Sequence, residues 1–140
     1  MKKGMLLAGL AVSTLLVTGC NESTEKTLNC TLKEETSGVT TTSVMDMKFN
    51  SKGTQVESIT MDIVTDYTED YESFADTFKQ TLESQKSSLE DVGYEVEITS
   101  GDLSQKLTAK GTSETLDESE STGTYEATKE SLEDAGYTCK

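Results

Sequence analysis

The side chains that could do acid–base chemistry are almost all carboxylates. The 140-residue chain contains 26 Asp and Glu and 12 Lys, with no histidine and no arginine. Without histidine, the usual general base for a serine or cysteine nucleophile is missing. Ser23-Thr24-Glu25-Lys26 fits an S-x-x-K pattern, but the S-D-N and K-T-G motifs that accompany it in penicillin-recognising serine enzymes are absent. A carboxylate-dependent hydrolase is therefore the enzymatic alternative that the composition leaves.

Cys20 follows a segment that has the order of a secretory signal. Lys2-Lys3 form a basic start, residues 5–17 are an apolar run, and Thr18-Gly19 are small residues directly before the cysteine. The run is too short for a membrane span. The pattern resembles the signal of bacterial lipoproteins, which implies that residues 1–19 are removed and that Cys20 carries a diacylglyceryl group. We therefore expect a lipid anchor at the extracytoplasmic face of the cell membrane; an ordinary cleaved signal is the alternative.

Two further cysteines, Cys30 and Cys139, lie near the two ends of the remaining chain. In an exported protein such a pair predicts a disulfide, because cytosolic reductants do not reach it. Two buried thiols are one alternative. A metal site is the other, but two cysteines without histidine fall short of a tetrahedral set, so we expect no metal and no cofactor.

The charge of the mature segment limits its partners. Residues 1–19 contain two lysines and no acid, so residues 20–140 keep ten lysines against 26 acids, a net charge of −16. Such a chain is a poor partner for nucleic acid and for anionic lipid, both of which attract basic segments. We expect no nucleic-acid partner and attachment to the membrane through the acyl chains alone. The charge itself is typical of a soluble surface, and attraction of cations or basic partners is the alternative.

Short segments with alternating apolar and polar side chains predict strands of a sheet that is buried on one face. They cover residues 27–36, 39–49, 59–63, 94–98 and 103–109, and residues 137–139 return to the sheet at the end. The inner faces of the second and third strands would carry Met45, Met47 and Met61 among other apolar residues.

Two segments have helical spacing instead. From Asp66 to Gly93, apolar residues recur at three- and four-residue steps and predict an amphipathic helix with Tyr71, Phe74 and Phe78 in the core. A second helix is predicted from about Thr124 to Ala135. Between the helices, residues 111–123 are rich in Asp, Glu, Ser and Thr, and we interpret them as a solvated loop.

One heptapeptide occurs twice. Ser88-Leu-Glu-Asp-Val-Gly-Tyr94 is echoed by Ser131-Leu-Glu-Asp-Ala-Gly-Tyr137. We interpret the echo as the same helix ending used twice, with the chain reversing at a C′ glycine, and not as a duplicated domain. The predicted fold is α+β: an antiparallel sheet of about five strands with two helices on one face, in the order βββαββα.

The chain organisation that follows is a signal peptide (1–19), a lipidated cysteine with a polar tether (20–26) and a single domain (27–140). With the cysteine signal, the Leu28-Asn29-Cys30-Thr31 strand and the closing Gly136-Tyr137-Thr138-Cys139-Lys140, this layout resembles the YehR-like family of small bacterial lipoproteins. The resemblance implies a compact α+β domain on a short lipid tether. It implies no activity and no catalytic residues.

These observations favour a non-catalytic binding or structural module, monomeric and anchored through Cys20. Its partner would be a small ligand or an envelope protein, bound at the solvated sheet face or at the acidic segment 111–123. The alternatives are the carboxylate-dependent hydrolase and a calcium-dependent adhesion module.

Overall fold

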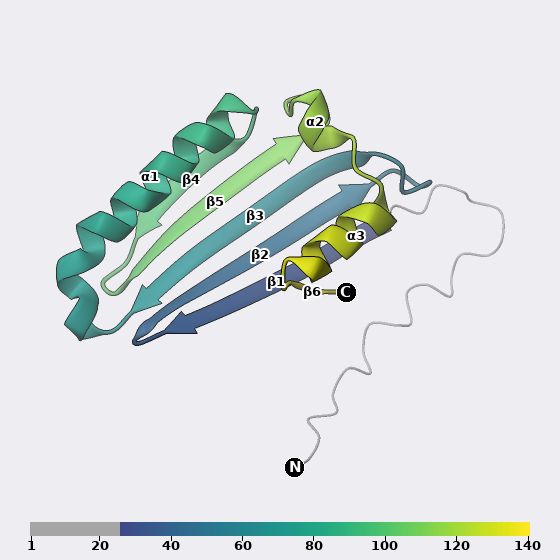
Figure 1. Ribbon diagram of the computed structural model, residues 1–140. Coiled ribbons are helices and arrows are strands. Elements are labelled where there is room, and N and C mark those ends of the chain that lie inside the picture. The colour runs from purple at the N-terminus through teal and green to yellow at the C-terminus, as the bar shows by residue number, and fades with distance from the viewer. Residues whose placement is uncertain (1–25) are drawn as a thin grey trace, which may run out of the picture.

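Residues 26–140 form an antiparallel sheet of six strands with helices packed on one of its faces (Figure 1). The structure is a computed structural model, and it describes these residues apart from the side chains of Ser119 and Ser121. The predicted signal peptide, Cys20 and residues 21–25 lie outside the described residues. The predicted α+β class and the order βββαββα are confirmed, with one short strand added at the end.

The six strands lie in the order β4-β5-β3-β2-β1-β6, and all neighbours are antiparallel. Their bounds are β1 Lys26–Thr36, β2 Val39–Phe49, β3 Val56–Tyr67, β4 Glu95–Ser100, β5 Ser104–Thr112 and β6 Thr138–Cys139. The first three strands form a meander. The β4–β5 hairpin then joins it through pairing of β5 with β3, and β6 adds to the opposite side beside β1.

The strand register places most apolar residues of the strands on one inner face, whereas Val44 and Val64 lie on the other. Leu28 pairs with Met47, and Met47 pairs with Ile59 on β3. Burial of this face against the helices is the main source of stability, because hydrophobic burial contributes about 25 cal/mol per Å². The buried apolar side chains are Leu28, Cys30, Phe49, Val56, Ile59, Tyr67, Leu82, Tyr94, Val96, Leu107, Ala109 and Leu116.

The long helical segment begins later than its periodicity predicts. Strand β3 continues to Tyr67, whose buried ring lies 5.0 Å from that of Phe78 and whose hydroxyl accepts a hydrogen bond from Gln105. A 3₁₀ helix, η2 (Glu69–Phe74), follows before α1 (Ala75–Asp91). With three residues per turn, η2 brings Tyr71 and Phe74 to the same side, at 6.0 Å between ring centroids.

The prediction that Tyr71, Phe74 and Phe78 are all core residues is wrong for Phe74. Its side chain is 51% exposed, whereas Tyr71 and Phe78 are half-buried. The change from an α-helical to a 3₁₀ turn rotates Phe74 away from the position that a continuous helix would have given it.

Two further helices follow β5. The short helix α2 (Glu118–Ser121) lies at the end of β5, and α3 (Tyr125–Asp134) crosses β1 and β6 (Figure 1). Thr124 caps α3 by accepting a hydrogen bond from the Ala127 amide at 3.3 Å, which agrees with the predicted start of this helix. Helix α1 packs mainly on β4 and β5, so the two long helices cover opposite sides of the same sheet face.

The repeated heptapeptide ends both helices in the same way. Gly93 and Gly136 have φ values of +99° and +96°. The amide of the following tyrosine donates to a leucine carbonyl five residues back, from Tyr94 to Leu89 and from Tyr137 to Leu132. This is the bonding of a Schellman motif. The interpretation of the echo as a helix ending used twice is therefore confirmed.

Candidate functional site

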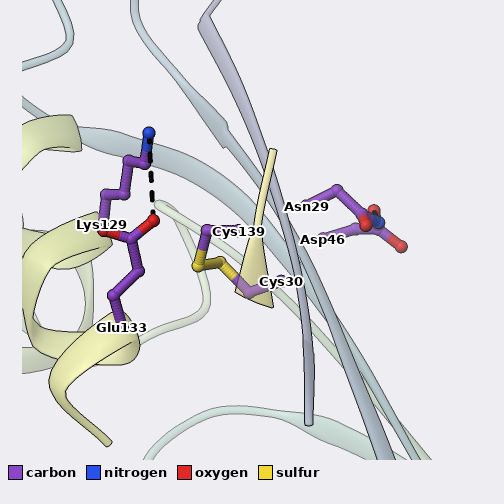
Figure 2. Close-up of a disulfide and its surroundings, with 6 residues drawn as sticks. All are labelled: Asn29, Cys30, Asp46, Lys129, Glu133 and Cys139. Atoms are coloured by element: carbon purple, nitrogen blue, oxygen red, sulfur yellow. Dashed lines mark hydrogen bonds and ion pairs between the residues drawn. A yellow bond between two sulfur atoms is a disulfide. The ribbon is translucent and has the colours of Figure 1, made fainter. Parts of the chain in front are cut away.

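The predicted disulfide is present between Cys30 and Cys139. The two residues are paired in the register of β1 and β6, with a Cα–Cα distance of 4.1 Å. Backbone hydrogen bonds between Asn29 and Lys140, at 2.8 and 3.1 Å, continue this pairing. Figure 2 shows the bridge beneath α3, while Asn29 and its hydrogen-bond partner Asp46 lie on the opposite face of the sheet. The buried position of Cys30 and the pairing of both residues give the bridge a structural role.

Of the S-x-x-K pattern, only Lys26 is among the described residues. It begins β1, and its Nζ lies 5.6 Å from the centroid of the Tyr125 ring. The ring of Tyr125 in turn meets the buried ring of Phe49 edge-on, at 5.5 Å. Lys26 therefore takes part in fixing α3 on the sheet through a cation–π contact.

The acidic segment 111–123 is less solvated than its composition predicts. It includes the end of β5 and helix α2, and the side chain of Leu116 is only 7% exposed. Leu116 lies against Gly111, where an added Cβ would meet its Cδ2 at 2.5 Å. The interpretation as a solvated loop is therefore wrong for the end of β5, for α2 and for Leu116, which packs on the core, whereas residues 112–115 are exposed as predicted.

The same segment contacts Tyr94. The Tyr94 hydroxyl donates a hydrogen bond to Oε2 of Glu120 at 3.3 Å. Burial of the phenol is the main cause that raises the pKa of Tyr94 to about 12; the negative charge of Glu120 and the hydrogen bond add to it.

We expect this shift to make stability fall with pH above the ordinary pKa of tyrosine. Below about pH 10 both the folded and the unfolded chain keep the Tyr94 proton, so its contribution is fully present. Between about pH 10 and about pH 12 only the unfolded chain loses the proton, and the free energy of unfolding decreases. Urea unfolding of the wild type and of Tyr94→Phe across this range measures the effect. The variant should have the shallower pH dependence, and equal slopes would contradict the assignment.

Two carboxylates do share a hollow, as the hydrolase alternative requires. Glu95 and Glu97 on edge strand β4 line a hollow of about 270 Å³ together with Lys110 and Thr108. The general acid of a glycosidase needs apolar surroundings that keep its carboxyl protonated. Both glutamates are exposed beside a lysine, so this hollow lacks such surroundings. Within residues 26–140, no three His, Cys, Asp or Glu side chains are grouped so that they could hold a metal ion.

A more apolar hollow lies on the inner face of the sheet, along the flank of α1. Its volume is about 340 Å³, and it is lined by Met61, Ile63, Ser84, Gln85, Ser88 and Leu89. A second hollow of about 200 Å³ shares Ile63 and Gln85 with it and continues to Val39 and Phe78. We call the two together the α1 groove. Its floor is formed by β3 and β2, its wall by α1, and a few hydroxyl and amide groups lie along the wall.

The sequence placed residues of this floor on the inner faces of the strands but did not indicate a groove. Met61 and Ile63, together with Met45 and Met47 on β2, are only half-buried. They contact the core from one side and are not sealed by a helix. A signal was present in the chain, since every methionine after residue 19 belongs to these two neighbouring strands.

Comparison with known proteins supports the fold and gives no information about function. No protein-family model matches the chain, and no curated protein is similar to it. A protein from Streptococcus pneumoniae TIGR4, solved by NMR, is similar in structure with a TM-score of 0.51 and 13% sequence identity. The similarity covers 100% of this chain and 97% of that one. Among the described residues, no helix has the length and apolar character needed to cross a membrane.

Proposed function

We propose that this protein is a non-catalytic binding module, anchored by lipid outside the bacterial cytoplasmic membrane, that takes a small apolar ligand in the α1 groove. The observation that carries the proposal is the half-buried apolar floor of the groove between α1 and the centre of the sheet. The module would act as a monomer, without cofactor or nucleic acid.

The groove has the composition of a small-molecule site. Ligand pockets are mostly apolar, have volumes of about 300–1,000 Å³ and contain a few polar groups that fix orientation. The larger hollow, of about 340 Å³, combines Met61, Ile63 and Leu89 with the amide of Gln85. The neighbouring hollow of about 200 Å³ extends it lengthwise past Phe78. A small elongated apolar molecule fits this combination better than a charged one.

The anchor is proposed from the sequence pattern around Cys20. Five residues separate it from Lys26 at the start of β1, and the six Cα–Cα steps between the two residues span at most about 20 Å. A diacylglyceryl group would then hold the domain close to the bilayer, and two acyl chains suffice for stable attachment. The mass of the chain purified from bacterial membranes tests this: it should begin at Cys20 and carry acyl groups, and a mature chain that begins elsewhere would refute the anchor.

We also propose membership of the YehR-like lipoproteins. The support is the layout: a cysteine signal, a short tether and one α+β domain closed by a strand that contains Cys139. The similarity to the pneumococcal protein supports the fold of this proposal and does not bear on the anchor or the ligand.

Filling the groove should abolish binding of an apolar probe. Ser84 lies on the wall of the groove, so Ser84→Trp places an indole in the hollow without touching the core. We expect the full chain to bind Nile red with a blue-shifted emission, and Ser84→Trp to weaken binding by at least about tenfold, or about 1.4 kcal/mol.

Ser87→Trp is the matched control for this experiment. Ser87 is an exposed residue of the same helix and does not line either hollow. It should bind Nile red as the wild type does. Equal binding by Ser84→Trp and the wild type would place the apolar site elsewhere and overturn the proposed function. Because the natural chain contains no tryptophan, the emission of each introduced indole also reports how far it is buried.

A further inference from the structure

The three methionines beside the α1 groove adjoin one another across two strands. Met45 and Met47 stand on the inner face of β2, two residues apart. Met61 on β3 is the direct register partner of Met45 and the diagonal neighbour of Met47. They are all the methionines that the chain contains after residue 19. We therefore asked what a cluster of the three methionines on adjacent strands could bind.

The register brings the three thioethers within reach of a common centre. Directly opposed residues have Cβ atoms about 5 Å apart, diagonal neighbours about 7–8 Å apart, and same-face neighbours on one strand about 7 Å apart. The centre of such a triangle lies about 4 Å from each Cβ. A methionine sulfur stands two bonds beyond Cβ on an unbranched, adaptable chain, so one metal–sulfur bond from each residue covers the remaining distance.

Complete burial would have argued for a purely packing role. The three side chains are instead half-buried, and each contacts the core from one side. Solvent and ions can therefore reach this part of β2 and β3 between α1 and α3, which pack mainly on the two sides of the sheet. The adjacent floor residue, Ile63, brings no competing polar group, and Cys30 beside Met45 has its sulfur in the disulfide.

We propose that Met45, Met47 and Met61 form a thioether site for a soft monovalent cation, Cu(I). Thioether ligands select Cu(I) among the first-row metals, whereas Cu(II), Zn²⁺ and Ca²⁺ prefer imidazole, thiolate or oxygen ligands. Three neutral ligands leave the positive charge of the ion in place. The net charge of −16 on residues 20–140 favours the approach of such a cation.

A thioether carries no proton at neutral pH, unlike the thiolate and imidazole ligands of most metal sites, which must be deprotonated first. Affinity for the cation should therefore be independent of pH between about 5 and 8. A site built from carboxylates would lose affinity toward the acidic end of this range. The inference adds a second ligand class beside the α1 groove of the proposed function, and it does not depend on the lipid anchor.

Silver(I) is the probe for this site, because it has the same charge and softness as Cu(I) and is stable in air. The experiment uses the full chain with Cys20→Ala in detergent and chloride-free buffer, so that no free thiol is present while the disulfide is intact. Calorimetry should give one Ag(I) per chain. With ¹³C-labelled methionine methyl groups, the signals of Met45, Met47 and Met61 should move together, while those of Met1 and Met5 serve as internal references.

The variants Met45→Leu, Met47→Leu and Met61→Leu each remove one sulfur at nearly constant volume, at a stability cost below about 1.5 kcal/mol. Each should weaken Ag(I) binding by about tenfold or more, since the loss of even an outer-shell partner costs that much. Ile63→Leu, on the same floor and without sulfur, is the matched control and should bind Ag(I) as the parent does. Thermal unfolding of every variant verifies that it is folded.

Nile red separates this inference from the proposed function. Met45→Leu and Met47→Leu change side chains that line neither hollow of the α1 groove, so these two variants should bind the dye as the parent does. A parent chain that binds Nile red but not Ag(I), or a triple leucine variant that binds Ag(I) as tightly as the parent, would overturn the metal site and leave the apolar site standing. A chain that binds neither probe would overturn both.

Discussion

Gly93→Ala is expected to destabilise the fold much more than Gly136→Ala, although both glycines end a helix within the same heptapeptide. Their φ values, +99° and +96°, carry nearly the same penalty for a side chain. They differ in their surroundings. An added Cβ at Gly93 would lie 1.9 Å from the carbonyl oxygen of Thr115, whereas at Gly136 the nearest atom is a methyl of Leu32 at 3.5 Å.

The clash at Gly93 cannot be relieved by a side-chain rotation, because the opposing atom belongs to the backbone. The segment that carries it is held on both sides: the Asp117 amide donates to the Val92 carbonyl at 3.1 Å, and Leu116 is buried in the core. Relief therefore requires the whole stretch after β5 to move away from the end of α1. That movement would expose Leu116 and break the contact between Tyr94 and Glu120.

Urea unfolding of the two variants measures the difference. Gly136→Ala should cost about 1–2 kcal/mol, the penalty for a left-handed conformation with a side chain. Gly93→Ala should cost about 3 kcal/mol or more, in the range of large single-residue effects that follow from a steric conflict. Equal losses for the two variants would mean that the segment around Thr115 yields easily, and that its packing on Gly93 contributes little.

This pair of glycines also shows which structural features can be predicted from the sequence. The heptapeptide predicts the same helix ending twice, and the structure has it twice, because a Schellman motif depends only on residues within one turn. The strands were likewise predictable, since alternation along β1 or β2 is a local property. The cost of replacing Gly93 was not predictable, because it depends on Thr115, which is distant in sequence.

The two wrong predictions, for Phe74 and for Leu116, also result from contacts between residues that are distant in sequence. Phe74 has the spacing of a core residue, but Tyr67 is drawn into the sheet by Phe78 and Gln105, and the chain then needs a 3₁₀ turn before α1 can begin. Leu116 has the sequence context of a polar loop, because its six neighbours on either side are mostly polar. Its pocket is made by Gly93 and Gly111 together, which only the folded chain brings side by side.

The candidate site was the least predictable part. Alternation placed the methionines on the inner face, and an inner face is normally sealed by helices. Whether a helix covers a given strand depends on where α1 and α3 cross the sheet, and they pack mainly on its two sides: α1 on β4 and β5, α3 on β1 and β6. The partly uncovered floor between them is thus a property of the tertiary arrangement. The Cys30–Cys139 bridge, by contrast, followed from counting cysteines.

Reduction of the Cys30–Cys139 disulfide is expected to cause the second large loss of stability. The bridge joins residues separated by 109 positions. Closing a loop of about 100 residues is worth about 4.7 kcal/mol in the chain-entropy model, and removal of native disulfides from small exported domains costs about 2–5 kcal/mol. The bridge also compensates for the shortness of β6, which has only two residues and two further hydrogen bonds between Asn29 and Lys140 to hold it.

Comparison of three samples separates the cross-link from the packing of the sulfur atoms. Oxidised wild type, reduced wild type and Cys30→Ala/Cys139→Ala are unfolded in urea, all with Cys20→Ala so that no other thiol interferes. The reduced wild type keeps the volume of the fully buried Cys30 side chain, so its loss of about 2–5 kcal/mol reports the cross-link alone. The double variant should lose slightly more, because it also leaves a small cavity beside Leu28 and Met45.

Amide hydrogen exchange gives the local consequence of the same reduction. The Lys140 amide donates to the Asn29 carbonyl at 2.8 Å, and it should lose its protection from exchange first. The amides of α3 should lose protection next, because α3 is held on the sheet at both of its ends. At its start the contacts of Lys26 and Phe49 with Tyr125 would remain, so α3 should stay tethered there and loosen from its C-terminal end. If reduction left the urea midpoint and the protection of Lys140 unchanged, packing of α3 alone would hold β6 in place, and the disulfide would have no part in the stability of this domain.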